Sequence, residues 1–189
     1  LKKNPFFSLV DNKYLVTKSK ESESDFDTIV VACRDIETIN IQPQIKFISS
    51  HAFENCMKLK TVNFTSNSSL KILESHAFFK SGIVNISLPD SLIKVGPQVF
   101  NENCNIESIE FNSKHIEIGS FSFYGCPKLI SISFPNAIKI DFGNYMFDNS
   151  NKSKIYVRHD AELTGDYIEK IKDRINYIDN FTSLNWRTR

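Results

Sequence analysis

A phrase centred on a phenylalanine recurs five times in this chain, and it constrains the fold more than any other feature of the sequence. Successive phenylalanines are 25, 22, 23 and 24 residues apart. A period in this range is typical of a stacked array, in which each unit buries its apolar face only against its neighbours. The sequence therefore predicts a solenoid of similar coils. The repeated phenylalanines are Phe53, Phe78, Phe100, Phe123 and Phe147.

Each coil is expected to contain one short strand of a parallel sheet. Downstream of the phenylalanine, apolar residues follow the spacing seen at Leu59, Val62 and Phe64. The last three positions alternate as a strand does, with two side chains facing the core and one facing outward. Strands of successive coils can then pair side by side, because the rest of the coil supplies the crossover that parallel pairing requires. Comparable segments occur at 36–41, 83–88, 106–111 and 129–134, and Pro43, Pro89 and Pro135 follow strand ends.

The segment before each phenylalanine predicts a second, briefer extended piece on the opposite side of the coil. The phenylalanine then projects inward from a single helical turn or tight loop, so that the stacked rings form a continuous aromatic core. Five segments carry this second pattern: 45–48, 70–73, 92–95, 116–118 and 138–140.

Two of the phrases, AFENCMKL around Cys56 and SFYGCPKL around Cys126, resemble the BspA-type leucine-rich repeat, a class found in surface proteins of bacteria and parasitic protists. The stretch from Asn4 to Ser19 is similar to the hairpin that such proteins insert between repeats, with Asp11-Asn12-Lys13 in place of a glycine turn. The resemblance covers about residues 4 to 160. It implies a strand-rich α/β leucine-rich-repeat fold: a right-handed solenoid with one parallel-sheet strand per coil. The fifth unit departs most, with Ser150 and Ser153 at the usual Cys and Leu positions.

We expect three parts along the chain. Residues 1–35 form an N-terminal β-hairpin or meander with a polar loop at 19–27, and residues 36–160 form about five to six repeats. Residues 161–189 form a C-terminal capping helix and tail, with Thr164 as the helix cap. Apolar residues at spacings of three and four, which are typical of a helix face, are Tyr167, Ile168, Ile171, Ile175 and Ile178.

The balance of charge argues against two classes of partner. The 189 residues include 23 Lys and Arg against 22 Asp and Glu. Nucleic acid and anionic membranes need a concentrated basic field, so neither is expected as a partner. No apolar run approaches the roughly 20 residues of a membrane span, and no secretory signal is recognisable. Since the sequence opens at Leu1 rather than Met, we expect it to be a piece of a longer protein.

The cysteines are interpreted as packing residues. Cys56, Cys104 and Cys126 lie three or four residues after a repeated phenylalanine, whereas Cys33 lies outside this register. We expect small buried thiols that fill one position of successive coils. The alternative is a disulfide between Cys104 and Cys126 of neighbouring coils. No Cys-x-x-Cys pair occurs, so the sequence does not indicate a zinc or redox site.

Catalytic and metal-binding chemistry is not expected. His51 and His76 each lie two residues before a repeated phenylalanine, so stacking would bring two imidazoles together as the start of a metal site. Gln98 and Phe121 occupy that position in the next coils, and no third ligand is recognisable. Neither a nucleophile motif nor a glycine-rich phosphate loop occurs. The sequence therefore predicts a protein that is not an enzyme and that holds no cofactor or metal.

Five Asn-x-Ser/Thr sequons are compatible with secretion. Two of them fall in predicted strands and should face outward, where a glycan would obstruct the sheet. Either those sites are unused or binding happens elsewhere. The sequon asparagines are Asn63, Asn67, Asn85, Asn151 and Asn180.

The outward strand positions form the predicted binding surface, a flat and almost uncharged sheet face rich in hydroxyl and amide groups. Such a face suits broad polar contact with protein or glycan, although these residues are also what an ordinary solvated strand would carry. The resemblance implies a non-catalytic, adhesion-type module of a larger cell-surface or secreted protein that binds a host or matrix protein. The alternative is an intracellular scaffold or regulatory protein. The predicted face comprises Thr38, Asn40, Thr61, Asn63, Asn85, Ser87, Ser108, Glu110, Ser131, Ser133 and Tyr156.

Overall fold

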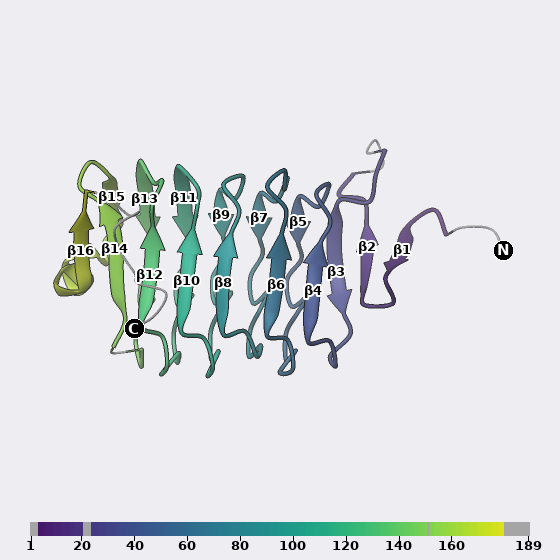
Figure 1. The fold of residues 1–189 in the computed structure, drawn as a ribbon, viewed down its shortest axis with the longest axis horizontal. Helices are drawn as coiled ribbons and strands as arrows, with labels where there is room; N and C mark the ends of the chain where they lie inside the picture. The colour runs from purple at the N-terminus through teal and green to yellow at the C-terminus, as the bar shows by residue number, and fades with distance from the viewer. Residues whose placement is uncertain (1–3, 21–23, 151, 180–189) are drawn as a thin grey trace.

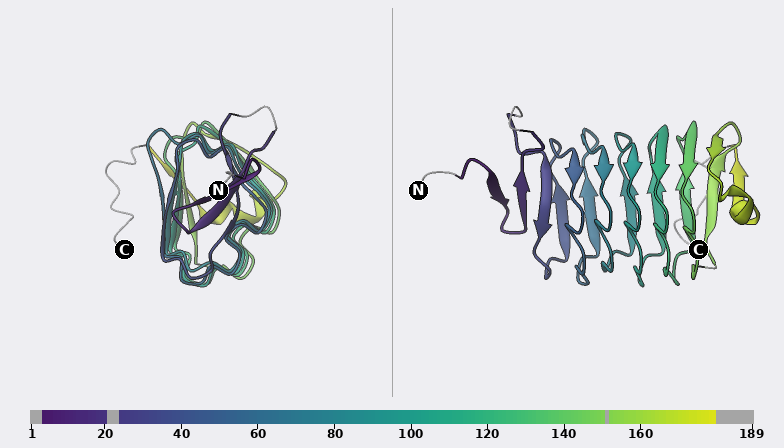
Figure 2. Two further views of the ribbon diagram at one scale, coloured as in Figure 1. Left: turned by 90° about the vertical axis from the view of Figure 1, so that its right-hand side faces the viewer. Right: turned by 180° about the vertical axis from the view of Figure 1, so that it is seen from behind.

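A computed structural model describes residues 4–20, 24–150 and 152–179 of the chain. It is an elongated stack of coils in which the chain advances steadily along one axis (Figure 1). Seen along that axis, the coils superimpose, so that equivalent residues of successive coils form rows (Figure 2). This arrangement confirms the solenoid that the phenylalanine spacing predicts.

The strands downstream of the repeated phenylalanines, with one further strand before them and one after them, form one face of the solenoid, and all of them are parallel. The first two, β4 (Thr38–Ile41) and β6 (Thr61–Phe64), pair with each other. The next, β8 (Asn85–Leu88), lies beside β6 and begins a five-stranded sheet. Inward and outward side chains alternate along these strands as predicted. The remaining strands of that sheet are β10 (Ser108–Phe111), β12 (Ser131–Phe134), β14 (Lys154–Arg158) and β16 (Ile175–Ile178).

A nine-stranded sheet forms the opposite face (Figure 1). It opens with an antiparallel hairpin of β1 (Phe7–Val10) and β2 (Tyr14–Thr17), to which β3 (Thr28–Ala32) adds. Asp11 and Asn12 at the hairpin turn have φ of 50° and 55°, which short polar residues tolerate without glycine. The hairpin that the resemblance implies is therefore present. The parallel strands that follow are β5 (Phe47–Ile48), β7 (Ile72–Leu73), β9 (Lys94–Val95), β11 (His115–Ile118), β13 (Lys139–Phe142) and β15 (Glu162–Thr164).

The third side of each coil is a tight turn around the repeated phenylalanine. Backbone N–H groups at every second residue donate to carbonyls of the next coil; the N–H of Phe53, for example, donates to Ala77 at 2.8 Å. Two residues of each turn, two before and two after the phenylalanine, have positive φ, as His51 (63°) and Asn55 (57°) do. These left-handed residues curl the backbone and keep its N–H groups aligned with the neighbouring coil. The turn thereby satisfies its polar backbone groups without forming a strand.

The repeated phenylalanines form the continuous aromatic core that their spacing predicts. All five rings are buried, and neighbours stack nearly parallel. Ring centroids are 4.9 Å apart between Phe53 and Phe78, 5.6 Å between Phe78 and Phe100, and 6.0 Å between Phe100 and Phe123. Phe147 continues the stack at 5.4 Å. Buried residues of both sheets belong to the same core, including Ile109 and Ile132 on the five-stranded sheet and Ile116 on the nine-stranded sheet.

The C-terminal capping helix is much shorter than the isoleucine spacing predicts. The helix α1 spans only Ile168–Ile171, and a 3-10 turn at Lys172–Arg174 follows. Thr164 belongs to β15 and does not cap the helix, which begins after Tyr167 without a side-chain cap. Ile175 and Ile178 lie in β16, which pairs in parallel with β14. The prediction of a helix through Ile178 is wrong because the free edge of β14 offers hydrogen bonds to a β-branched segment.

Candidate interaction surfaces

The predicted sheet face exists, and its exposed part lies on β4, β6 and β8. Thr38, Asn40, Thr61, Asn63, Asn85 and Ser87 are all exposed to solvent. Between them, Ile39, Val62 and Ile86 point into the core. The strands therefore present six neutral polar side chains as a flat surface. Its rigidity comes from the parallel pairing of β4 with β6 and from the packed core beneath it.

The face is not exposed along its whole length. Ser108 and Tyr156 are half-buried, and the exposed fractions of Glu110, Ser131 and Ser133 are 9%, 4% and 0%. The prediction that these last three residues face solvent is wrong. In the register, Ser133 lies between Glu110 on β10 and Tyr156 on β14, whose longer side chains flank the small hydroxyl on both sides. Strand alternation determines which face a residue occupies, but neighbouring side chains determine its exposure.

Hydrogen bonds between neighbouring coils fix several of these side chains. Asn63 Nδ2 donates to Asn40 Oδ1 at 2.9 Å, and Ser108 Oγ donates to Asn85 Oδ1 at 2.6 Å. A third bond runs from Ser87 Oγ to a Glu110 carboxylate oxygen at 2.8 Å. These bonds hold polar groups in place before a partner arrives, which reduces the entropy that binding would cost.

Among the sequon residues, Asn63 and Asn85 are exposed but take part in those bonds. Asn67 is exposed in the turn after β6 and is free of the sheet. Asn151 and Asn180 lie outside the residues that the structure describes, as do residues 180–189 of the predicted tail and residues 21–23 of the predicted polar loop.

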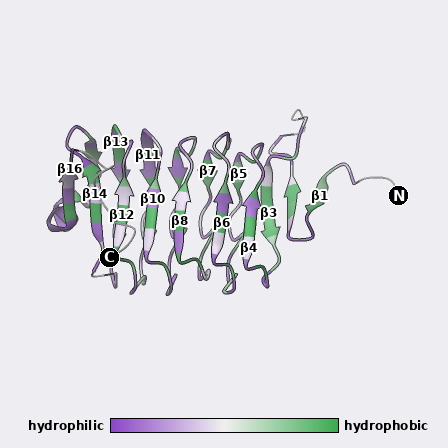
Figure 3. Cartoon of the chain, viewed as in Figure 1, coloured by the Kyte–Doolittle hydropathy of each residue, from purple (hydrophilic) through white to green (hydrophobic). Residues whose placement is uncertain are grey.

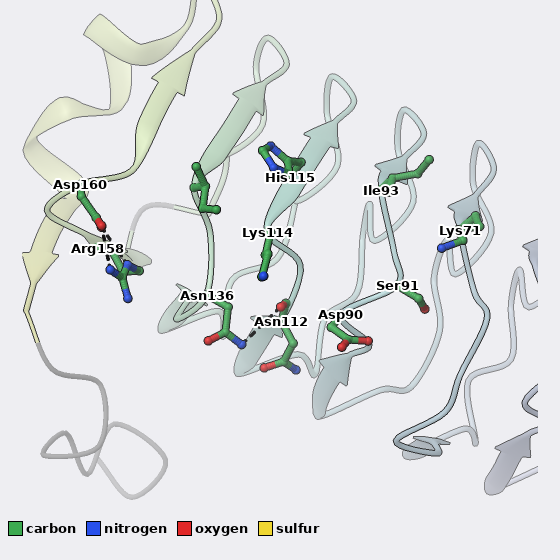
Figure 4. Close-up of a pocket in the computed structure, with 11 residues that line it drawn as sticks. Lys71, Asp90, Ser91, Ile93, Asn112, Lys114, His115, Asn136, Arg158 and Asp160 are labelled. Carbon is green, nitrogen blue, oxygen red and sulfur yellow. Dashed lines mark hydrogen bonds and ion pairs between the residues drawn. The ribbon is translucent and has the colours of Figure 1, made fainter.

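A shallow groove of about 570 Å³ runs along the corner between the two sheets (Figure 4). Amide side chains line its middle, where Asn136 Nδ2 donates to the backbone oxygen of Asn112 at 3.3 Å. At one end the guanidinium of Arg158 makes two hydrogen bonds to the Asp160 carboxylate, at 2.8 and 2.7 Å. Sequence reasoning missed this groove; the polar residues that follow successive strands were its only indication. Its lining is Lys71, Asp90, Ser91, Ile93, Asn112, Lys114, His115, Asn136, Ile138, Arg158 and Asp160.

The two predicted histidines do come together on the turn side. The rings of His51 and His76 stack with centroids 4.8 Å apart. His51 Nδ1 lies 2.7 Å from a Glu54 carboxylate oxygen, and Ser75 Oγ lies 3.0 Å from His76 Nδ1. Partial burial, and then the neighbouring His51, lower the pKa of His76 below its ordinary value. Among the residues described, no group of three His, Cys, Asp or Glu side chains is arranged to hold a metal ion.

The cysteines fit the packing interpretation only in part. All four are free thiols. Cys56 and Cys126 are buried as expected, but Cys104 is exposed, and the prediction that it fills a core position is wrong. The buried position is the third residue after each phenylalanine, and in that coil it is Asn103. Cys104 is the fourth residue and points out of the coil. Cys33, outside the register, is also exposed.

Colouring by hydropathy shows hydrophobic and more polar residues following one another along the strands of the visible sheet (Figure 3). Within the described ranges, no helix has both the length and the apolar character needed to cross a bilayer.

Comparison with solved structures supports the fold. The chain matches the pneumococcal vaccine antigen PcpA with a TM-score of 0.64 and 18% identity, covering 94% of this chain and 47% of that one. It matches a leucine-rich cell surface protein of Faecalibacterium prausnitzii A2-165 with a TM-score of 0.65 and 20% identity, covering 93% and 43%. For the T. pallidum leucine-rich repeat protein TpLRR the TM-score is 0.62 at 16% identity, covering 90% and 92%.

The present chain therefore spans less than half the length of the first two of these proteins. A comparison of the sequence with curated proteins gives no match. The sequence model for the BspA type leucine rich repeat region matches residues 31–154 in six copies, from β3 to the start of β14. Since this match covers most of the chain, the protein belongs to the BspA-type leucine-rich repeat family.

Proposed function

We propose that this domain is a non-catalytic interaction module of a larger surface or secreted protein, and that it binds a host or matrix protein through the sheet face. The observation that carries this proposal is the exposed face of β4, β6 and β8, where neutral hydroxyl and amide groups stand on a rigid sheet. A flat surface of this kind offers many hydrogen bonds without a deep pocket, which suits a protein partner better than a small molecule.

The comparisons support a place at the cell surface. One similar structure is a vaccine antigen and another is described as a cell surface protein. The chain spans less than half of each, which supports its being one part of a longer protein.

Capture of matrix and host-cell proteins by the recombinant domain tests the binding face. Asn85→Arg and Thr61→Arg place bulky charges on the exposed strands and should reduce capture at least about tenfold, since buried unpaired charge costs more than 1.4 kcal/mol. Met57→Arg is the matched control, because Met57 is 69% exposed on the turn side. Capture that survives both sheet variants would place the contact off this face.

An intracellular scaffold is the second candidate, and the four free cysteines favour it, since thiols persist in reducing compartments. Labelling of native cells with an impermeant amine reagent separates the two. Labelling of the intact protein supports the surface proposal. Labelling only after lysis, together with an unmodified Asn67, would support the scaffold.

A further inference from the structure

The residue two positions before each buried phenylalanine adopts a backbone conformation that most side chains disfavour. His51, His76, Gln98, Phe121 and Tyr145 have φ between 55° and 63°. Glycine adopts this left-handed conformation freely, and asparagine and histidine tolerate it, but phenylalanine and tyrosine seldom adopt it. At the other left-handed position of the turn the chain uses Asn55, Gly125 and Asn149, among others. Phe121 and Tyr145 thus occupy positions where a glycine would fold more easily, which suggests that their rings serve another purpose.

These two rings belong to a row of aromatic side chains that crosses three coils. The ring of Phe121 stacks on that of Tyr145 at 5.3 Å, and Tyr145 lies 5.7 Å from Tyr167. Tyr124 meets the edge of Phe121 at 6.2 Å. We call these four residues the aromatic row. Phe121 is 36% and Tyr145 52% exposed, whereas the core beneath them already contains its own phenylalanine stack. Tyr167 packs partly against the core, whereas Phe121 and Tyr145 present apolar surface to solvent.

The hydroxyl groups of the row are mainly available as donors. Asn149 Nδ2 donates to the Tyr124 hydroxyl oxygen at 2.9 Å, and the Tyr124 hydroxyl donates to no group among the residues that the structure describes. Within the described ranges, the Tyr145 hydroxyl makes no hydrogen bond. The Tyr167 hydroxyl donates to an Asp148 carboxylate oxygen at 2.7 Å, so its proton is not available to a ligand. The surface thus combines aromatic rings with two free hydroxyl donors.

We propose that the aromatic row binds a proline-rich segment of a partner protein in the polyproline II conformation. Proline has no backbone N–H, so such a segment offers apolar rings and carbonyl acceptors but few donors. Aromatic surfaces that supply hydroxyl donors complement it on both counts. Because a polyproline II helix is already extended before binding, it loses little entropy on docking. The inference rests on the proposed protein-binding function, but it assigns this contact to the turn side rather than to the sheet face.

Titration of a fluorescent octaproline peptide with the domain, followed by anisotropy, tests the proposal. Tyr145→Gly removes a ring and relieves the backbone, so binding should weaken at least tenfold while the thermal midpoint stays equal or rises. Tyr145→Phe keeps the ring and removes the donor, and should weaken binding without changing the midpoint. Gln98→Gly is the matched control, because it relieves the same conformation where no ring is present; its peptide binding should equal that of the wild type.

Three results would overturn the proposal. Absence of octaproline binding to the wild type would do so, and binding of a linear oligosaccharide instead would assign the row to glycan. A fall in midpoint for Tyr145→Gly but not for Gln98→Gly would make the ring structural. Equal peptide binding by Tyr145→Phe, Tyr145→Gly and the wild type would place the contact elsewhere. The sheet variant Asn85→Arg should retain peptide binding, so that failure of the sheet-face proposal and failure of the aromatic row are measured separately.

Discussion

The thiol of Cys126 donates a hydrogen bond, at 3.1 Å, to the carbonyl oxygen of Phe100 in the preceding coil. The same link recurs along the solenoid with different chemistry. Asn103 Nδ2 donates to the oxygen of Phe78 at 2.8 Å, and Ser150 Oγ donates to that of Phe123 at 2.5 Å. In these three coils the third residue after the phenylalanine is therefore a buried donor to the carbonyl of the phenylalanine one coil before. The two earlier coils differ, since Cys56 Sγ donates to Cys33 O at 3.7 Å and Ser81 Oγ donates to the Asn103 side-chain oxygen at 2.5 Å.

Position 126 should require a hydrogen-bond donor to the Phe100 carbonyl, and not a sulfur atom as such. Cys126→Ser keeps a donor of the kind that Ser150 already provides, so the free energy of unfolding should fall by less than about 1 kcal/mol. Cys126→Val fills the space but leaves the Phe100 oxygen unpaired, which should cost about 1–3 kcal/mol. Urea denaturation measures both values. Equal stability of the two variants would mean that the hydrogen bond contributes nothing.

The stacked core makes a separate prediction. Phe100 and Phe123 are fully buried and packed between neighbouring rings. Replacing either by alanine leaves a cavity, and the free energy of unfolding should decrease by about 3–5 kcal/mol. Met57→Ala, on the exposed turn, should change it by no more than about 0.5 kcal/mol. A loss below about 1 kcal/mol for Phe100→Ala in thermal or urea unfolding would contradict the prediction that the stacked rings stabilise the core.

The position of the core could be predicted because its cause is local and repeated. Each phenylalanine lies seven or eight residues before the strand that follows it, and stacking transfers that register from coil to coil. Exposure on the outer face could not be predicted in this way. Ser87 and Ser133 occupy equivalent strand positions, yet Ser87 is exposed and Ser133 is buried, because their neighbours differ.

The secondary structure at the C-terminal end of the solenoid could not be predicted for a different reason. Ile168 and Ile171 lie in helix α1, whereas Ile175 and Ile178 lie in strand β16, although the spacing continues unchanged. The open edge of β14 decides the outcome, and that edge exists only after the coils have stacked. The aromatic row could not be predicted either, because Phe121 and Tyr145 become neighbours only in the folded chain.

Two glycines should differ in what can replace them. A side chain at Gly119 would place its Cβ 2.5 Å from the backbone nitrogen of Pro97, so Gly119→Ala should lower stability by about 1–3 kcal/mol or more. Gly125 has φ of 67° and faces the flexible side chain of Glu102. Because Asn55 and Asn149 occupy the equivalent position in other coils, Gly125→Asn should cost less than about 1 kcal/mol. Thermal unfolding compares the stabilities of Gly119→Ala and Gly125→Asn. A larger loss for Gly125→Asn would contradict the close backbone contact between neighbouring coils at Gly119.

The four thiols should divide into two classes of reactivity. Cys33 and Cys104 are exposed and should react with an aromatic disulfide reagent in the native protein. Cys56 and Cys126 are buried, and burial raises the pKa of the Cys126 thiol to about 12, so little thiolate forms at neutral pH. Two equivalents should therefore react quickly and two only on unfolding. Rapid reaction of all four would contradict the buried positions, and a Cys104→Ser variant should lose one fast equivalent.

Stability should fall in mildly acidic solution because of His76. Its pKa in the folded protein is lowered, first by partial burial and then by the neighbouring His51. The unfolded chain therefore binds a proton more readily, starting near the ordinary value of about 6.5. The stability that comes from keeping His76 neutral in the folded protein is therefore fully present above about pH 6.5. It is lost as the pH falls from that value towards the pKa of His76 in the folded protein. His76→Gln introduces the residue that Gln98 provides in the next coil and removes the titration. Urea midpoints measured between pH 7.5 and 5 should thus decline less for the variant than for the wild type, and parallel declines would exclude His76 as the cause.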